Sequence, residues 1–477
     1  MTTTEKNEIK FGTDGWRGVI SDNFTFKNVR LVAQSISEWA KNDLQSIHGK
    51  KIIAIGYDTR FLSKEYAEIV ACVLAANDIE IHLSNSAIPT PALSFGVVGL
   101  KAVAGIMITA SHNPAKFNGI KIKNYQGGGA SSDITNKVEH YIEKTAVQTL
   151  DFDAAKNAKK IVIHDFKVAY LKFMKNYIDL AKIKKAKFKV LQDVMHGSGA
   201  RLLEEVLKGS QLRLSLMRSD VNPSFDGGKP EPVVEFLQGI MKRVKDEKFD
   251  LGLVVDGDAD RIAAVAPGGE FIHPQKILGL LILHLARNRG RQGGVVKTIC
   301  GTTMIDNIAK KLGLKLYETP VGFKYISDLM VSERIVAGGE EAGGMGVQDY
   351  IPERDGTLAG LLLLEMMVYQ KKNIKEILKE MEKEFGRYYY ERCDLKLGEG
   401  KIDIEEVKKI KTLLGKKVID RKDFDGVKLI CEDGSWLMLR PSGTEPLVRA
   451  YSESKSLKRA KELIKFGESL LRHPLPT

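Results

Sequence analysis

Apolar and polar positions alternate along the chain in blocks that predict strands followed by helices. Residues 102–108 are an apolar run, which is typical of a strand buried on both faces. Strands are also expected at 51–57 and 80–83, and stretches with a helical period lie at 29–41 and 65–77. This alternation predicts βαβ units and a mostly parallel sheet covered by helices.

The same alternation continues as far as residue 386. A charged segment at 147–160 marks the end of the first unit, so a second unit is expected to begin at Ile161. Near Tyr388 the pattern changes to closely spaced strands separated by turn sequences, which favours an antiparallel sheet. The predicted domains are residues 1–150, 151–262 and 263–386, all α/β, and residues 387–477, a smaller α+β unit.

The composition is that of a globular protein with a large core. The chain has 477 residues, 43% hydrophobic and 28% charged, and at roughly 100–200 residues per domain this length agrees with three or four domains. Its formal net charge is +12, which suits either nucleic acid or a small anionic substrate. The lysines are interleaved with glutamates on the helices predicted at 374–384 and 457–465, and no basic stripe rich in aromatic residues is present. Nucleic acid is therefore disfavoured as a partner.

The cysteines and the apolar segments bear on the cellular compartment. Cys72, Cys300, Cys393 and Cys431 are far apart and form no CxxC pair, so we expect reduced thiols and a cytoplasmic protein. The N-terminal residues contain no apolar segment of the kind found in signal peptides. No window approaches the length of about 18 apolar residues that a membrane span needs, so no membrane partner is expected.

A hydroxyl lies where the buried strand 102–108 ends. Ser111 follows that strand, and Pro114 prevents the strand or a helix from simply continuing. Open α/β sheets bind their ligands at the carboxyl ends of strands, so Ser111 is a candidate functional residue. The alternative is an ordinary turn in which Ser111 and Asn113 satisfy backbone donors.

Two basic residues are candidates to act beside this serine. Arg17 lies between glycines in Gly15-Trp16-Arg17-Gly18, a sequence that suits a turn presenting a guanidinium, although a plain turn is the alternative. Asn118-Gly119 is a strong hairpin signal, so Lys121 is expected on a strand that returns toward Ser111. A solvated strand lysine is the alternative for Lys121.

Three carboxylates follow the strand predicted at 251–255. Asp256, Asp258 and Asp260 occupy alternate positions, and in extended backbone they point to one side. Such like charges repel one another unless a cation neutralises them, so a metal site is favoured over a solvated acidic loop. An EF-hand is excluded because its sixth position, which must be glycine, is Arg261 here. Mg²⁺ fits best, since it takes few protein carboxylates and completes its shell with water and phosphate.

Two further loops carry polar groups in patterns that suit a sugar phosphate. Glu340 and Glu341 lie in a glycine-rich stretch, 338–344, and are suited to accept hydrogen bonds from sugar hydroxyls; solvated acids are the alternative. Residues 440–446, with Arg449 beyond, combine hydroxyls, a glycine turn and two arginines, as a phosphate dianion requires. An ordinary hairpin is the alternative there.

Together, four stretches resemble the motifs of the α-D-phosphohexomutase family, and the resemblance spans nearly the whole chain. Thr109–Pro114 resembles its phosphoserine motif and Asp256–Arg261 its metal loop. Gly339–Gly344 resembles its sugar-binding loop and Arg440–Pro446 its phosphate-binding loop. The resemblance implies three similar α/β domains with mixed sheets and a smaller C-terminal α+β domain, arranged around a central cleft.

The resemblance also implies an activity, the reversible interconversion of hexose 1-phosphate and hexose 6-phosphate. Ser111 is then expected to be phosphorylated, with Mg²⁺ held between its phosphate and the three aspartates, and glucose 1,6-bisphosphate to be the intermediate and activator. Lys121 is assigned as acid/base and Arg17 as electrostatic support, with His112 beside the serine. The residues expected to contact substrate are Arg261, Gly322, Lys324, Glu340 and Ala342, with Arg440, Ser442, Gly443, Thr444 and Arg449 at the non-reacting phosphate.

Departures from the family pattern bear on the sugar. Ala342 stands where the sugar loop usually has serine, Gly344 where the phosphomannomutase type has histidine, and Lys324 where that type often has histidine. The last two changes resemble phosphoglucomutases, so glucose is the first choice, mannose stays open and glucosamine is less favoured.

Other classes of protein fit the sequence less well. An aspartyl phosphatase usually has Thr or Val at the fifth position of its acidic loop, where this chain has Asp260. No Gly-Lys pair is followed by Ser or Thr as in a P-loop kinase. A non-enzymatic binder of divalent cations or nucleic acid is the remaining alternative. Sugar phosphates are the expected partners, and the sequence leaves the oligomeric state open.

Overall fold

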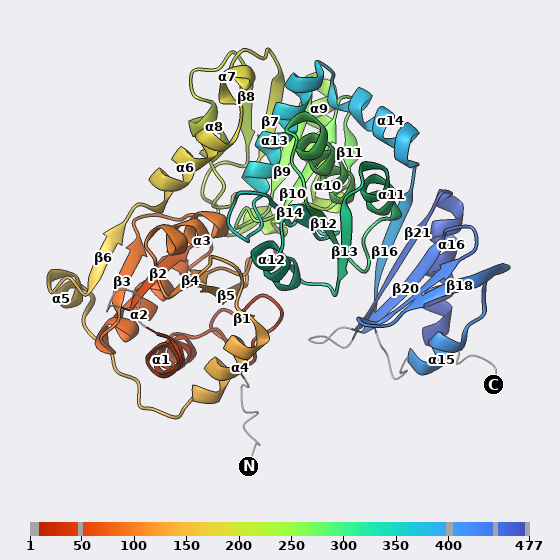
Figure 1. Cartoon of the computed structure of the whole chain (residues 1–477). Helices are drawn as coiled ribbons and strands as arrows, with labels where there is room; N and C mark the ends of the chain where they lie inside the picture. The colour runs from red at the N-terminus through yellow and green to blue at the C-terminus, as the bar shows by residue number, and fades with distance from the viewer. Residues whose placement is uncertain (1–8, 46–50, 397–403, 442–446, 473–477) are drawn as a thin grey trace.

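The computed structural model describes residues 9–45, 51–396, 404–441 and 447–472. Within these residues the chain forms four sheets with helices packed against them, and Figure 1 shows the four units following one another in an arc. The first three sheets mix parallel and antiparallel pairs, and the last is antiparallel. This arrangement confirms the predicted fold class.

The first unit places Ser111 at the carboxyl end of a central strand. Its strands are β1 (Trp16–Val19), β2 (Ile52–Tyr57), β3 (Glu80–Ser84), β4 (Ala104–Ile108), β5 (Phe117–Asn124) and β6 (Ile161–His164), and its helices are α1 (Phe26–Asp43), α2 (Ser63–Ala76), α3 (Thr90–Gly99), α4 (Ser132–Tyr141) and α5 (Phe152–Asn157). The strand order is β1-β5-β4-β2-β3-β6. Every residue of β4 is buried, as its apolar run predicts.

Two predictions about this unit are wrong. Ile161 does not open the second unit, because β6 pairs in parallel with β3 and Ile161 packs into the first core. Asn118-Gly119 is not a turn, because both residues lie within β5, between β1 and β4. A Cβ on Gly119 would lie 2.6 Å from the carbonyl oxygen of Thr109 and 2.7 Å from that of Trp16, so this glycine permits the close approach of neighbouring backbone. Lys121 nevertheless lies on a strand that returns beside β4, as expected.

The second unit carries the three aspartates. Its elements are β7 (Lys189–Asp193), β8 (Arg213–Met217), β9 (Leu251–Val255), β10 (Ile262–Ala266) and β11 (Glu270–Ile272), with α6 (Phe166–Tyr177), α7 (Leu180–Ile183), α8 (Leu202–Leu207), η1 (Phe225–Gly227), η2 (Val234–Phe236) and α9 (Gln238–Asp246). The strand order is β11-β10-β9-β7-β8, so the unit extends to Ile272 and the predicted boundary after residue 262 is wrong. Asp256 follows immediately after the buried strand β9, which pairs with β10 on one side and β7 on the other.

The third unit shares its core with the second. Its elements are β12 (Gly294–Thr298), β13 (Lys315–Thr319), β14 (Ile335–Gly339) and β15 (Met345–Val347), with α10 (Pro274–Leu283), the π-helical η3 (His284–Asn288), α11 (Thr303–Leu312), α12 (Phe323–Ser332), α13 (Gly356–Gln370) and α14 (Ile374–Phe385). The strand order is β13-β12-β14-β15. Helix α13 is capped by Asp355, which accepts from the amide of Leu358, and it packs against β9 and β10 of the second sheet. One apolar cluster therefore extends through both units, and it also includes residues of α3 and β4 in the first unit, such as Leu93 and Met107.

The fourth unit stands at one end of the arc and is joined to the rest through β16, as the blue strands in Figure 1 show. Its elements are β16 (Tyr389–Lys396), α15 (Ile404–Lys409), β17 (Thr412–Leu413), β18 (Lys416–Lys422), β19 (Val427–Cys431), β20 (Trp436–Pro441), β21 (Leu447–Ser454) and α16 (Leu457–Arg472). The strand order β16-β21-β20-β19-β18-β17 gives the antiparallel sheet that the turn sequences predict.

Among the described residues, no helix combines the length and the apolar character that crossing a membrane requires.

Candidate active site

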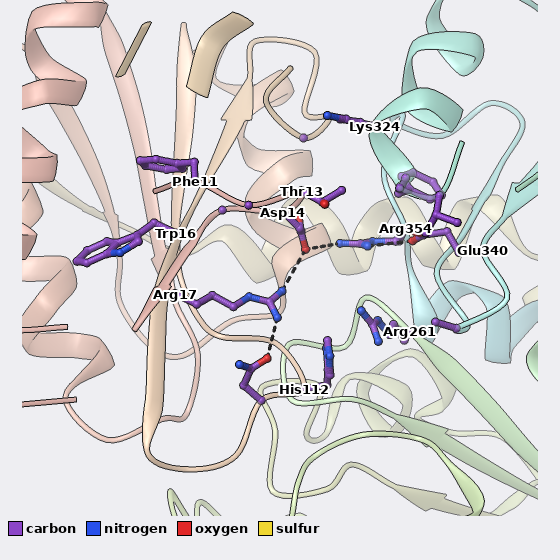
Figure 2. A pocket seen from close by; sticks show the side chains of 18 of the residues that line it. Phe11, Thr13, Asp14, Trp16, Arg17, His112, Arg261, Lys324, Glu340 and Arg354 are labelled. Carbon is purple, nitrogen blue, oxygen red and sulfur yellow. Dashed lines mark hydrogen bonds and ion pairs between the residues drawn. The ribbon is translucent and has the colours of Figure 1, made fainter. Parts of the chain in front are cut away.

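All four units line one cleft, a cavity of about 930 Å³. The first unit contributes Arg17 and His112, the second Glu231 and Arg261, the third Lys324, Glu340 and Glu341, and the fourth Arg392, Arg440, Arg449 and Tyr451. Figure 2 shows Arg17 on one side of this cleft and Arg354, Glu340 and Arg261 on the other, with His112 between them in the lower part of the view. A pocket of this size lined by so many cations suits a small anionic ligand.

Ser111 lies on the loop that follows β4, directly before His112 and Asn113, which line this cleft. Its φ is +52°, in the left-handed region that non-glycine residues seldom adopt. Its side chain is fully buried, and the hydroxyl donates to Asp256 Oδ2 over 3.1 Å. His112 Nδ1 lies 3.3 Å from the same hydroxyl, and the His112 side chain lines the cleft. The predicted juxtaposition of the serine with the acidic loop is therefore present.

The three aspartates converge on one point. One carboxylate oxygen from each of Asp256, Asp258 and Asp260 lies within 4.8 Å of the others, and all three side chains are buried. The backbone that brings them together is a turn with Ala259 at φ +55°, so the predicted extended conformation is wrong. Burial and the neighbouring carboxylates Asp260 and Asp258 raise the pKa of Asp256 well above its ordinary value.

These residues fit a divalent cation. The Oδ1 atoms of Asp258 and Asp260 are buried and accept no hydrogen bond, although buried carboxylate oxygens normally do. Oxygen ligands of this kind are the ones that Mg²⁺ prefers. The buried acidic triad is therefore a candidate metal site.

Lys121 supplies positive charge to the same triad. Its Nζ lies 2.8 Å from Asp258 Oδ2 and 3.0 Å from Asp260 Oδ2, and Asp14 Oδ2 is 3.0 Å away. Burial lowers the pKa of Lys121, but the carboxylates of Asp14, Asp258 and Asp260 outweigh it and raise the pKa above its ordinary value. The side chain is therefore a stable ammonium, which suits charge neutralisation and proton donation better than proton abstraction.

Arg17 and His112 line the cleft beside Ser111. Arg17 Nη1 donates to Asn113 Oδ1 over 2.7 Å, and its Nη2 lies 3.7 Å from Asp14 Oδ2. Burial and the nearby Arg261 and Arg17 guanidiniums lower the pKa of His112 well below its ordinary value, so its ring is neutral. Arg17 thus lies beside the serine loop, but on strand β1 and not in the turn that its flanking glycines predict.

The predicted sugar-binding residues reach the cleft from the third unit. Glu340 accepts from Arg354 Nη1 over 3.1 Å, and burial raises the pKa of Glu340. Ala342 lies in the same loop and also lines the cleft. Gly322, at φ +130°, precedes α12, and Lys324 on that helix donates to Ser132 Oγ of the first unit over 2.7 Å. Figure 2 shows Glu340 and Lys324 on the same side of the cleft.

The predicted phosphate-binding arginines line the cleft from the fourth unit. Arg440 Nε donates to Asp425 Oδ1 over 2.8 Å, and Arg449 Nε lies 3.7 Å from Asp394 Oδ2. Arg392, which the sequence analysis did not single out, lines the cleft beside them. Ser442, Gly443 and Thr444 lie outside the described residues.

Sequence reasoning also missed residues that connect the predicted ones. Arg354 Nη2 donates to Asp260 Oδ2 over 2.6 Å and to Asp14 Oδ2 over 2.9 Å, so it links carboxylates of the first two units to Glu340. Thr90 donates to Asp258 Oδ2 over 2.5 Å, and Arg60 contacts the loop of Ser111. Of these missed residues, Asp14 is the one close in sequence to an ion-pair partner, since it lies three positions before Arg17. The other contacts join residues far apart in the chain.

Comparison with known proteins agrees with this geometry. Phosphoglucomutase/phosphomannomutase models match alpha/beta/alpha domain I at 8–149, domain II at 168–269, domain III at 273–385 and the C-terminal domain at 394–466. The chain therefore belongs to the phosphoglucomutase/phosphomannomutase family, and it is a phosphohexomutase, an enzyme that transfers a phosphoryl group within a sugar phosphate. The resemblance inferred from the motifs is confirmed.

The names of individual relatives refer to different sugar phosphates. The Thermococcus kodakarensis phosphoglucomutase/phosphomannomutase is 28% identical over 98% of this chain and 99% of the relative. A Methanosphaera stadtmanae protein assigned as a phosphoglucosamine mutase is 30% identical over 97% of this chain and 98% of its own length. A crystal structure of a Thermus thermophilus protein assigned as a phosphomannomutase has a TM-score of 0.86 and 31% identity, covering 98% of this chain and 99% of that one. The family is thus common to these proteins, whereas the sugar differs among their names.

Proposed function

We propose that the chain interconverts hexose 1-phosphates and hexose 6-phosphates with Ser111 as the phosphoryl carrier. The observation that carries this proposal is the Ser111 hydroxyl, 3.1 Å from Asp256 in a buried acidic triad and next to a basic cleft shared by four units. Phosphoryl transfer needs a nucleophile held in place and positive charge around the moving group, and this arrangement supports both.

The proposed reaction consists of two transfers. In the first, the free hydroxyl oxygen of a hexose phosphate attacks the phosphorus of phosphoserine 111, the bond to Ser111 Oγ breaks, and a hexose 1,6-bisphosphate forms. The hydroxyl proton passes to Ser111 Oγ, and Lys121 is the predicted acid/base residue for this transfer. Its ammonium suits the donation of a proton to Ser111 Oγ. The bisphosphate then turns over, and its other phosphoryl group returns to Ser111.

The cations of the cleft divide into two groups in this scheme. Arg17 and Arg261 lie on the side of Ser111 and stabilise charge on the group in transfer. Arg440 and Arg449, from the fourth unit, hold the phosphate that does not react, together with the loop 442–444. Glu340 orients the sugar between them by accepting hydrogen bonds from its hydroxyls.

Asp256, Asp258 and Asp260 are proposed to hold Mg²⁺ together with the phosphate on Ser111. The unpartnered buried oxygens of Asp258 and Asp260 support this assignment. The bound ion supplies positive charge that stabilises the transferring phosphoryl group.

Glucose is the proposed first choice of sugar, and glucose 1,6-bisphosphate the corresponding intermediate. Gly344 and Lys324, which stand where the phosphomannomutase type has histidines, support this choice. The names of the relatives keep mannose and glucosamine as competing sugars. Values of kcat/KM for glucose 1-phosphate, mannose 1-phosphate and glucosamine 1-phosphate rank the three directly, and a higher value for either competitor would replace glucose.

Replacement of the serine tests the carrier role. Ser111→Ala should abolish turnover of glucose 1-phosphate, and intact-mass spectrometry of the wild type should reveal a phosphorylated fraction that glucose 6-phosphate discharges. Ser84→Ala is a matched control, because Ser84 is a buried serine at the end of the parallel strand β3, which β2 separates from β4. Turnover by Ser111→Ala at the wild-type rate would remove this serine from the mechanism.

A further inference from the structure

We infer that Arg60 is a positioning residue that holds Ser111 in the conformation required for phosphoryl transfer, an inference that rests on the function proposed above. Arg60 lies between β2 and α2, and its side chain is buried. Its Nη2 donates to the carbonyl oxygens of Ser111 and Asn113, over 2.6 Å in each case. Its Nη1 donates to the carbonyl oxygens of Pro114 and Phe117, over 3.0 and 3.1 Å. One guanidinium thus donates hydrogen bonds to four carbonyl oxygens of the serine loop, which we define as residues 109–117.

The same network fixes the other peptide group of Ser111. The Ser111 amide donates to Thr109 Oγ1 over 2.9 Å, and that hydroxyl donates to Asp58 Oδ2 over 2.6 Å. Asp58 Oδ2 also lies 3.2 Å from Arg60 Nε, and the two side chains are almost completely excluded from solvent. Asp58 and Arg60 therefore hold the Ser111 amide and carbonyl through one connected network.

This restraint matters because of the backbone conformation of Ser111. A serine at φ +52° is in a region that an unrestrained chain seldom occupies. The Ser111 carbonyl oxygen that Arg60 holds is also the atom against which Gly257 of the acidic loop packs, since a Cβ on Gly257 would lie 2.6 Å from it. Arg60 therefore sets the position of the serine relative to the aspartates without touching the substrate.

A guanidinium is needed for this arrangement. Its planar fork presents five N–H donors in fixed directions, whereas a lysine has three donors on one nitrogen. Arg60 also lies over the ring of Phe225, with the guanidinium carbon 4.9 Å from the ring centre. Arg60→Lys keeps a positive charge opposite Asp58 but cannot reach the four carbonyls together.

The first experiment compares Arg60→Lys with the wild type in steady-state kinetics on glucose 1-phosphate. Displacing a reacting group by about 1 Å costs on the order of 100-fold in rate, so kcat should fall by about that factor while KM stays within about threefold. Arg289→Lys is the matched control. The Arg289 guanidinium lies 4.9 Å from the Tyr177 ring, its Nε is 3.4 Å from the buried Glu365, and it does not line the cleft. Equal kcat for Arg60→Lys and the wild type, or equal losses for the two lysine variants, would overturn the inference.

The second experiment measures amide hydrogen exchange in the intact protein. Arg60→Lys should increase exchange in peptides covering the serine loop and leave those covering β9 unchanged, and Arg289→Lys should change neither. If Arg60→Lys does not fold, the double variant Asp58→Asn/Arg60→Gln removes both buried charges and carries the same expectation. Unchanged exchange in the serine loop would contradict a positioning role. Because this readout needs no turnover, it tests Arg60 even if the wild type fails to convert hexose phosphates, which would refute only the proposed function.

Discussion

Replacing Gly257 by alanine tests whether the acidic loop must lie directly against Ser111. Gly257 stands between Asp256 and Asp258, and a Cβ there would lie 2.6 Å from the Ser111 carbonyl oxygen. The Pro230 ring approaches the same position to 3.0 Å, so the added methyl group has no open direction. Ordinary van der Waals contact begins at 3.4 Å, and the two loops must therefore part by the difference, about 0.8 Å.

This displacement sets the expected size of the effect. A misplacement of about 1 Å at a reacting centre costs on the order of 100-fold in rate, so Gly257→Ala should lower kcat by about 10- to 100-fold. The KM for glucose 1-phosphate should change by less than about threefold, because Arg440, Arg449 and Glu340 line other parts of the cleft.

The assay couples glucose 6-phosphate formation to a dehydrogenase, at saturating glucose 1,6-bisphosphate and over a series of Mg²⁺ concentrations. Gly99→Ala is the control, since a Cβ on Gly99 would meet nothing within 4 Å. A kcat for Gly257→Ala within twofold of the wild type, or equal losses of activity in both alanine variants, would refute a requirement for close contact between the two loops.

Three other perturbations follow from contacts described above. Asp258→Asn should raise the Mg²⁺ concentration for half-maximal activity by about 10-fold or more; activity that persists in excess chelator would refute the metal assignment. Gly119→Ala should lower the free energy of unfolding by about 1–3 kcal/mol, since the methyl group would meet two backbone carbonyls; an unchanged urea midpoint would contradict this. Burial and the nearby Lys297 lower the pKa of Lys428 to about 7 in the folded chain. In the unfolded chain the pKa of a lysine is about 10.4, so between these two pH values the unfolded chain binds one more proton than the folded chain. Stability should therefore rise between about pH 7 and 10 by up to about 1.4 kcal/mol per pH unit, and Lys428→Met should flatten that rise; parallel wild-type and variant profiles of unfolding free energy against pH would disprove it.

Local pattern was sufficient for the elements that are uniformly apolar or clearly capped. Strand β9 matches the strand predicted at 251–255, because a continuous apolar run defines it, and helix α13 begins directly after the capping residue Asp355. No helix was predicted for α3, which has Pro91 in its first turn, or for α12, which Gly322 precedes. Proline is well tolerated in the first turn of a helix, and a glycine just before a helix does not interrupt it.

Contacts between segments far apart in the chain could not be predicted from local sequence patterns. The pairing of β6 with β3 and the burial of Asn118-Gly119 within β5 are decided by the sheet and override local turn signals. The spacing of the three aspartates predicted that their side chains lie together, and their mutual repulsion predicted a metal site. The turn that brings them together depends on Ala259 at a φ that few alanines adopt. Arg60 contacts Ser111, 51 positions away, and Arg354 contacts Asp260, 94 positions away, so neither role is visible in local spacing.

The placement of α13 has a consequence for how this molecule can flex. The helix comes from the third segment of the chain but rests on strands of the second, so the middle of the protein behaves as a single block whose halves cannot slide apart without exposing apolar surface. The same apolar cluster includes Leu93 and Met107 of the first unit, so we expect any opening around a sugar to come mainly from movement of the fourth unit. A chain cut between residues 272 and 273, after β11 and before α10, should yield fragments that are insoluble when alone and refold only when mixed.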